Sequence, residues 1–206
     1  KSMNIKKIIA GLTLSLLLSS GMVVAADFDK GLDAYYREDG QAAFVEWIPL
    51  AEQGNADAQA MLGDLYSRTF PRWISSYKTS FGWYSKAAEQ GNAKAQRELG
   101  SMYSSGRGIP KDDQKSLEWY IKSAHQGDFE AQQELGNLYL KGQVIPKDNL
   151  RAYMWFNLGV FNADMNFMVG TTENAREEIA KEMTPADVSK AQEMSSRCLE
   201  SNYTDC

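Results

Sequence analysis

The sequence is poor in the residues from which most catalytic and metal sites are built. Its 206 residues include one histidine, His125, and two cysteines, Cys198 and Cys206. A C-x7-C spacing without further Cys or a nearby His is not a metal-ligand pattern, and neither a phosphate-binding P-loop nor a dinucleotide fingerprint is present. We therefore expect no enzyme activity, no cofactor and no metal ion.

One short motif keeps a hydrolytic or β-lactam-binding enzyme open as an alternative. Ser75 and Lys78 have the Ser-x-x-Lys spacing of the nucleophile in penicillin-binding enzymes. The Ser-Asp-Asn motif that accompanies it in those enzymes is missing. We regard the match as a chance occurrence.

Clustered positive charge along the sequence is also lacking. The formal net charge is −5, from 22 Lys and Arg against 27 Asp and Glu. Residues 1–26 hold three Lys and no acid, so the remainder carries 19 basic against 27 acidic side chains, a net of −8. Binding to phosphate backbones needs a basic patch. Nucleic acid is therefore excluded as an expected partner.

The first 26 residues have the pattern of a secretory signal peptide. Lys6 and Lys7 precede an apolar run over residues 8–24, and Ala25 and Ala26 provide a small-residue cleavage site. An uncleaved membrane anchor is the alternative, but the run is short for a full span. We expect cleavage after Ala26 and a mature protein that is periplasmic or secreted, with no membrane attachment.

Export changes how the two cysteines are interpreted. Cys198 and Cys206 are close in the sequence, and nearby cysteines in an oxidising compartment are usually bridged. Closing so short a loop stabilises a fold by about 2–3 kcal/mol on a chain-entropy estimate. A redox or metal role is the alternative. We predict a Cys198–Cys206 disulfide.

The rest of the chain repeats itself. Four tryptophans, at positions 47, 83, 119 and 155, are separated by constant steps of 36 residues. Three segments that follow them align with one another, each beginning with Ala and reaching Gln-Gly, and each continues to a Leu-Gly pair and a Tyr. These segments begin at Ala51, Ala88 and Ala124. Two units then pass through a glycine-containing loop into Ile-Pro-Lys-Asp, at residues 109–112 and 145–148.

Each repeated position has a physical explanation. Asp112 and Asp148 are expected N-caps of helices. Leu117, Tyr120, Ile121 and Ala124 form an apolar stripe at helical spacing, beside a second stripe of Ser116, Trp119 and Ser123, as expected of a helix with two packing neighbours. Gly127 should turn the chain. Gly136 lies inside the second helix, where we expect close helix–helix approach to require it. We expect Trp119 and Tyr139 to be core residues.

These repeated residues closely resemble the Sel1-like repeat, a relative of the tetratricopeptide repeat. The resemblance implies an all-α fold, a right-handed superhelical solenoid of helix pairs with helical caps. We expect a capping helix at 27–40, repeats at 41–162 (three full units and the first helix of a fourth), and a C-terminal helical cap at 163–206 that contains the cysteine pair.

The resemblance also implies a function in protein–protein interaction. Members of this family are mostly scaffolds or receptors of bacterial envelopes and secretory pathways, and some resemble immunity proteins that neutralise secreted toxins such as type VI phospholipase effectors. The expected partner is therefore a protein, either a toxin effector or an envelope component. A spacing scaffold with several partners is the alternative.

The link at residues 67–80 departs most from the repeat. It is one residue longer than its counterparts, has lost their glycines, and mixes aromatic with basic side chains. Such a mixture is typical of a recognition surface, although a loop that covers a gap between units would also explain it. The candidate partner-binding residues are Phe70, Arg72, Trp73, Tyr77 and Lys78. Residues 161–169, with two Met and two Phe, either cap the solenoid or offer an adaptable contact surface.

Overall fold

A computed structural model of the chain describes residues 26–67, 76–163 and 169–206, in which it contains ten helices and no strand. The predicted signal peptide at 1–26 lies outside this part except for Ala26, so it stays a prediction. None of the helices in the described part is long and apolar enough to span a membrane. The helices are α2 (Phe28–Tyr36), α3 (Gly40–Glu52), α4 (Ala56–Ser67), α5 (Tyr77–Glu89), α6 (Ala93–Ser105), α7 (Asp113–Ala124), α8 (Phe129–Lys141), α9 (Asn149–Asn162), α10 (Val169–Lys181) and α11 (Pro185–Glu200).

The helix boundaries follow from capping residues. Asp112 accepts a hydrogen bond from the backbone N–H of Lys115 at 3.0 Å, and Asp148 accepts one from Arg151 at 2.9 Å. Both predicted N-caps are therefore confirmed. Gly127 has a φ of 83°, a left-handed conformation that suits glycine, and turns the chain between α7 and α8 as predicted.

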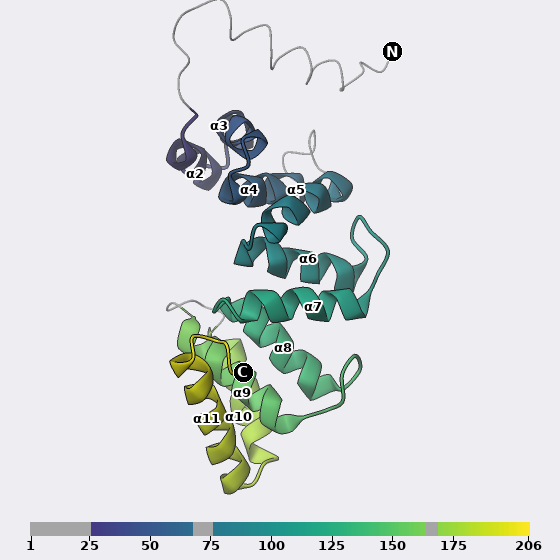
Figure 1. Cartoon of the computed structure of the whole chain (residues 1–206), viewed down its shortest axis with the longest axis vertical. Helices are drawn as coiled ribbons and strands as arrows, with labels where there is room; N and C mark the ends of the chain where they lie inside the picture. The colour runs from purple at the N-terminus through teal and green to yellow at the C-terminus, as the bar shows by residue number, and fades with distance from the viewer. Residues whose placement is uncertain (1–25, 68–75, 164–168) are drawn as a thin grey trace, which may run out of the picture.

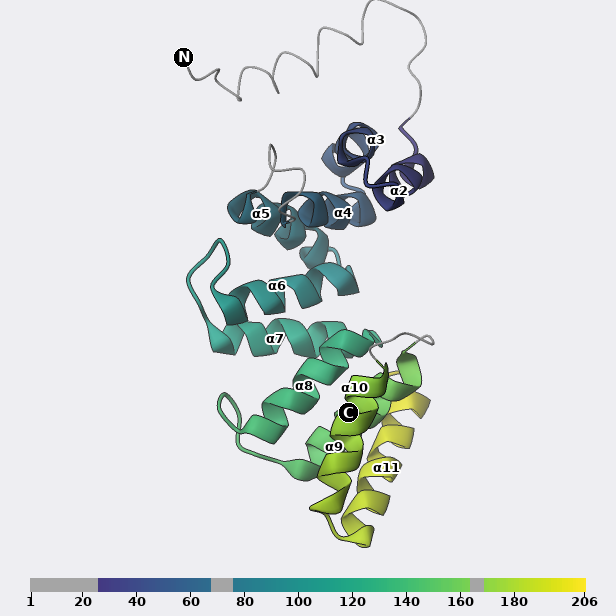
Figure 2. The ribbon, with the colours of Figure 1, turned by 180° about the vertical axis from the view of Figure 1, so that it is seen from behind.

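The helices stack into an elongated solenoid in which α2 to α10 pack mainly on their neighbours along the chain, whereas α11 packs on α9 (Figure 1). Seen from behind, the same order runs from α2 at one end to α11 at the other (Figure 2). The core passes from unit to unit as adjoining clusters of buried Ala, Leu and aromatic side chains. The expected all-α repeat solenoid is confirmed.

Each repeat unit consists of a first helix and a second helix, as α3 with α4, α5 with α6 and α7 with α8. A glycine in each second helix makes room for an aromatic ring from the first helix of the next unit. An added Cβ on Gly63 would lie 2.5 Å from the Tyr84 ring, and one on Gly100 would lie 2.8 Å from the Tyr120 ring. Gly136 has the same relationship to Phe156, at 2.6 Å. Close approach is thus the reason for a glycine inside these helices, as the sequence predicted for Gly136.

The constant spacing of the four tryptophans does not reflect structural equivalence. Trp47 lies over Gly31 of α2, in the position that Tyr84 occupies over Gly63. Trp83 therefore lies one position earlier in its helix than Trp47 does, because the link at 67–80 is one residue longer. By this geometry α2 packs on α3 as a second helix packs on the first helix of the next unit.

Two residues expected in the core are only partly buried. Trp119 packs against the cluster around Leu99 but is partly exposed, and the Nζ atom of Lys122 lies 4.1 Å from the centroid of its ring. Tyr139 is also partly exposed. The fully buried aromatic positions are those opposite the glycines, as Trp47 and Phe156 show.

Buried glutamines join successive units. Gln96 is 6 % exposed, donates a hydrogen bond from Nε2 to the carbonyl of Ala88 at 3.1 Å, and accepts one at Oε1 from Gln126 at 2.7 Å. Gln59 and Gln132 make the same pair of bonds in their units, with Gln90 and Asn162 as donors. We call Gln59, Gln96 and Gln132 with their three donors the amide ladder.

The C-terminal helices α10 and α11 pack against α9 and close the stack. Cys198, which is fully buried, and Cys206 form a disulfide with Cα atoms 4.8 Å apart. Tyr203 lies in the closed loop next to Asn162, the last donor of the amide ladder. The Tyr203 hydroxyl donates a hydrogen bond to Oδ1 of Asn162 at 2.8 Å.

Candidate partner-binding surface

The predicted recognition residues are divided between described and undescribed parts of the chain. Phe70, Arg72 and Trp73 lie outside the described residues, so their proposed role stays a prediction, as does the alternative that the link covers a gap. Tyr77 and Lys78 form the first turn of α5, and both are exposed, Tyr77 by 37 %. Ser75 of the Ser-x-x-Lys motif also lies outside the described residues.

The loop between α6 and α7 lies directly against the start of α5. Gly108 has a φ of 77°, and an added Cβ would lie 2.7 Å from the carbonyl carbon of Tyr77. Only glycine allows this approach at that backbone conformation. The contact brings the guanidinium carbon of Arg107 to 6.0 Å from the centre of the Tyr77 ring, within range of a weak cation–π interaction.

Related aromatic–cation pairs follow along the same edge of the solenoid. The Nζ atom of Lys115 lies 5.4 Å from the Tyr103 ring, and the guanidinium carbon of Arg151 lies 5.9 Å from the Tyr139 ring. The α6–α7 and α8–α9 loops that flank these pairs lie on one side of the solenoid in both views (Figures 1 and 2). We call this surface the basic–aromatic edge: residues 76–78, 103–115 and 139–151.

Part of this edge could have been found in the sequence. Tyr103 and Tyr139 are 36 residues apart, and so are Lys115 and Arg151. The repeat period therefore contains the signal for the two later pairs. The pairing of Arg107 with Tyr77 has no such signal, because it depends on how the α6–α7 loop folds back on α5.

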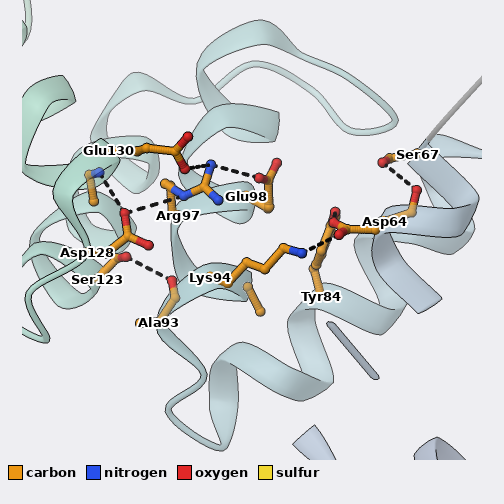
Figure 3. A network of polar contacts seen from close by, with 12 residues as sticks. Asp64, Ser67, Tyr84, Ala93, Lys94, Arg97, Glu98, Ser123, Asp128 and Glu130 are labelled. Carbon is orange, nitrogen blue, oxygen red and sulfur yellow. Dashed lines mark hydrogen bonds and ion pairs between the residues drawn. The ribbon is translucent and has the colours of Figure 1, made fainter. Parts of the chain in front are cut away.

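A second polar cluster lies between the second helices (Figure 3). Asp64 of α4 is mostly buried and accepts hydrogen bonds from the Tyr84 hydroxyl and from the Nζ atom of Lys94. Burial, followed by the neighbouring Asp64 carboxylate, raises the pKa of Tyr84 well above its usual value, so its phenol stays protonated. This group therefore connects α4, α5 and α6.

Arg97 extends the cluster from α6 to α8. Its guanidinium lies 2.9 Å from Glu98, 3.4 Å from Asp128 and 2.7 Å from Glu130. Burial opposes the charged form of Arg97, but the three carboxylates outweigh it and raise its pKa. Burial also raises the pKa of Glu98, which Arg97 partly offsets. Because Arg97 pairs with carboxylates of α6 and of the N-cap and first turn of α8, we interpret this cluster as an inter-unit contact.

His125 lies at the C-cap of α7. Its ring stacks on Trp155 with 5.7 Å between centroids, and this partial burial lowers its pKa. Within the described ranges, no group of three or more His, Cys, Asp or Glu side chains could hold a metal ion.

Comparisons with known proteins agree with this architecture. The Sel1 repeat model matches residues 56–92, 93–128 and 129–159. A Sel1 repeat protein from Oxalobacter formigenes superposes with a TM-score of 0.61 at 24 % identity, over 86 % of this chain and 78 % of that one. No protein with curated annotation matches the sequence.

A second solved structure is also similar. It is c5321, a protective antigen of uropathogenic Escherichia coli strains with an SLR fold, at a TM-score of 0.52 and 26 % identity. The match covers 85 % of this chain but 46 % of that one, so the chain spans less than half of this relative's length. Because three consecutive Sel1 repeats cover half of its residues, the chain belongs to the Sel1 repeat family, whose repeats are protein–protein interaction modules.

Proposed function

We propose that this chain is an exported protein-binding module that uses its basic–aromatic edge as the docking surface. The observation that carries the proposal is the contact of Arg107 with Tyr77, in which the guanidinium carbon lies 6.0 Å from the ring centre. Both side chains are exposed, and Tyr77 belongs to the divergent link. The first turn of α5 positions Tyr77, and the α6–α7 loop, which lies against α5 at Gly108, positions Arg107. Tyrosine and arginine are among the residue types that most often dominate binding energy.

Two features support export to an oxidising compartment. Residues 1–26 have the order of a signal peptide: basic residues, an apolar run and small residues at the end. The Cys198–Cys206 bridge is of the kind that persists in the periplasm or outside the cell. We propose that the protein acts there, after cleavage.

The finer proposal is that the chain serves one main partner, as an immunity protein does for a secreted toxin such as a phospholipase effector. The support is that the link at 67–80 departs from the repeat pattern where residues 106–112 and 142–148 keep it. A scaffold with several partners would be expected to carry specialised segments in more than one unit. Of the three links that lead into α5, α7 and α9, only the first is specialised, which favours a dedicated partner.

A pull-down from periplasmic extract tests these proposals. The natively exported full-length chain, with a C-terminal tag, is compared with a variant carrying Tyr77→Ala and Arg107→Ala. We expect one enriched protein, a toxin-type hydrolase, that the variant recovers at a tenth of the amount or less. Several envelope components instead would favour the scaffold. Retention of the chain in the cytoplasm, or equal recovery by both forms, would contradict the proposal.

A further inference from the structure

We infer that the basic–aromatic edge recognises an acidic segment of the partner polypeptide, a short stretch rich in Asp and Glu. This inference rests on the proposed function, because it names the chemistry of the partner at the same surface. Three observations support the inference. The edge is positively charged while the rest of the described surface is negatively charged, four cations of the edge have no carboxylate partner, and Arg107 lies beside Tyr77.

The fold separates charges that are dispersed in the sequence. The basic–aromatic edge holds seven Lys and Arg against three Asp, a net charge of +4. The other described residues hold ten Lys and Arg against 23 Asp and Glu, a net charge of −13. The sequence shows no basic cluster because the seven cations come from three segments that the helix pairs bring to one edge. A surface of this sign is complementary to an anionic partner.

The three acidic side chains of the edge are already paired with cations of the same edge. Asp112, Asp113 and Asp148 lie 2.8–3.6 Å from Lys115, Lys111 and Arg151, respectively, and two of these acids cap helices. Four further cations have no carboxylate within 4.0 Å in the described part of the chain, and all four are exposed. They are Lys78, Arg107, Lys141 and Lys147.

Arg107 is suited to hold a carboxylate. It belongs to a loop that the Gly108–Tyr77 contact fixes against α5, and its guanidinium carbon lies 6.0 Å from the Tyr77 ring centre. A guanidinium beside an aromatic ring can still donate two parallel hydrogen bonds to one carboxylate. Tyr77, which is 37 % exposed, adds apolar contact area next to this fork.

A polypeptide fits this surface better than a nucleic acid does. A nucleic acid carries regularly spaced phosphates along its whole length, so it would extend from the edge over surfaces that carry a net charge of −13. An acidic peptide segment can confine its charges to the edge. Electrostatic recognition of this kind acts strongly on association rate and weakens with salt.

Fluorescence anisotropy with defined probes tests the inference on the natively exported full-length chain. The probes are a labelled peptide of about eight glutamates with one tyrosine, the same peptide with glutamines, and a single-stranded oligothymidine of equal charge. We expect the glutamate peptide to bind in 50 mM salt, at least tenfold more tightly than either other probe, and to dissociate in 500 mM salt.

Charge-reversal variants then locate the site. Arg107→Glu combined with Lys147→Glu should weaken glutamate-peptide binding at least tenfold, about 1.4 kcal/mol. Lys181→Glu combined with Lys190→Glu makes the same change in net charge on α10 and α11 and should weaken binding less than twofold. Circular dichroism verifies that each variant is folded. Since the four side chains are exposed, we expect unchanged spectra.

Several outcomes would overturn the inference: no binding of the glutamate peptide, equal loss in both double variants, or equal affinity for the oligothymidine. These results are distinct from failure of the proposed function. A partner recovered in the pull-down that binds the Arg107→Glu, Lys147→Glu variant normally would refute the acidic-segment inference alone. Glutamate-peptide binding at the edge with no protein partner recovered would refute the proposed function alone.

Discussion

The Tyr203 hydroxyl donates a hydrogen bond to Oδ1 of Asn162 at 2.8 Å, and Asn162 in turn donates from Nδ2 to Oε1 of Gln132 at 2.9 Å. The disulfide loop thus ends the amide ladder with a tyrosine. Tyr203 has a φ of 63°, a conformation that a non-glycine residue adopts at some cost and that the closed loop maintains. The bridge and the hydrogen bond should therefore depend on each other.

We predict that Tyr203→Phe lowers the free energy of unfolding by about 1 kcal/mol, the value of one hydrogen bond. Cys206→Ala should lower it by about 2–3 kcal/mol, since the constraint on the unfolded chain is lost. In the Cys206→Ala background, Tyr203→Phe should cost less than half of its effect in the native chain. Urea denaturation followed by circular dichroism measures the cycle. Strictly additive effects would show that the loop does not hold Tyr203 in place.

The glycine–tyrosine contacts predict opposite effects of one substitution at two helical sites. Gly100→Ala places a Cβ 2.8 Å from the Tyr120 ring, and overpacking of this kind costs about 1–3 kcal/mol. Gly82→Ala is the matched control, because it lies inside α5 with no atom within 4 Å of the added Cβ and should stabilise by up to about 1 kcal/mol. Thermal melts compare the two. A higher melting temperature for Gly100→Ala would exclude close packing as the reason for that glycine.

The amide ladder predicts measurable coupling between units. Gln96→Leu removes the bonds to the Ala88 carbonyl and the Gln126 amide and should cost about 1–3 kcal/mol, because the buried carbonyl of Ala88 loses a donor. Gln126→Ala removes one bond at an exposed residue and should cost less than 1 kcal/mol. A double-mutant cycle in urea isolates the bond between them. Zero coupling energy would mean that the ladder does not connect the units energetically.

His125 predicts a dependence of stability on pH. Partial burial against Trp155 lowers its pKa in the folded chain, so the unfolded chain binds the proton more tightly. The contribution of His125 to stability is complete above pH about 6.5, the usual histidine value, and is lost as the pH falls toward the lower folded pKa.

Proton NMR can follow this directly, because His125 is the only histidine of the chain. Its ring-proton signal should titrate at a lower pH in the native protein than in the same protein unfolded in urea. A folded pKa equal to the unfolded one, or above it, would show that the helix dipole outweighs burial.

Most of the fold could be predicted from the sequence because the repeat encodes local features. The caps Asp112 and Asp148 and the turn at Gly127 depend on residues a few positions away, and the structure confirms them. The structural position of Trp47 is harder to predict. Trp83 follows it by the repeat spacing of 36 residues, but the link at 67–80 is one residue longer than its counterparts, so Trp47 corresponds to Tyr84 instead. A period in the sequence therefore identifies repeats without assigning equivalent positions.

The candidate surface was less predictable for a different reason. Tyr77 and Lys78 can be identified from the sequence because the link at 67–80 departs from the repeat and mixes aromatic with basic residues. Arg107 cannot, since it approaches Tyr77 through the backbone contact at Gly108. Contacts between a loop and the preceding helix pair leave no periodic trace in the sequence. The gathering of dispersed cations at one edge is likewise a property of the stacking.

Packing limited mainly to chain neighbours has a consequence for how the molecule assembles. Each helix finds its principal partners in segments that were synthesised shortly before it, so a chain that crosses a membrane from its N-terminus can stack as it emerges. In a chain exported in this way, α2 and α3 would dock first and α11 last. The Cys198–Cys206 bridge then becomes the final step, a covalent closure that forms when the whole stack is present.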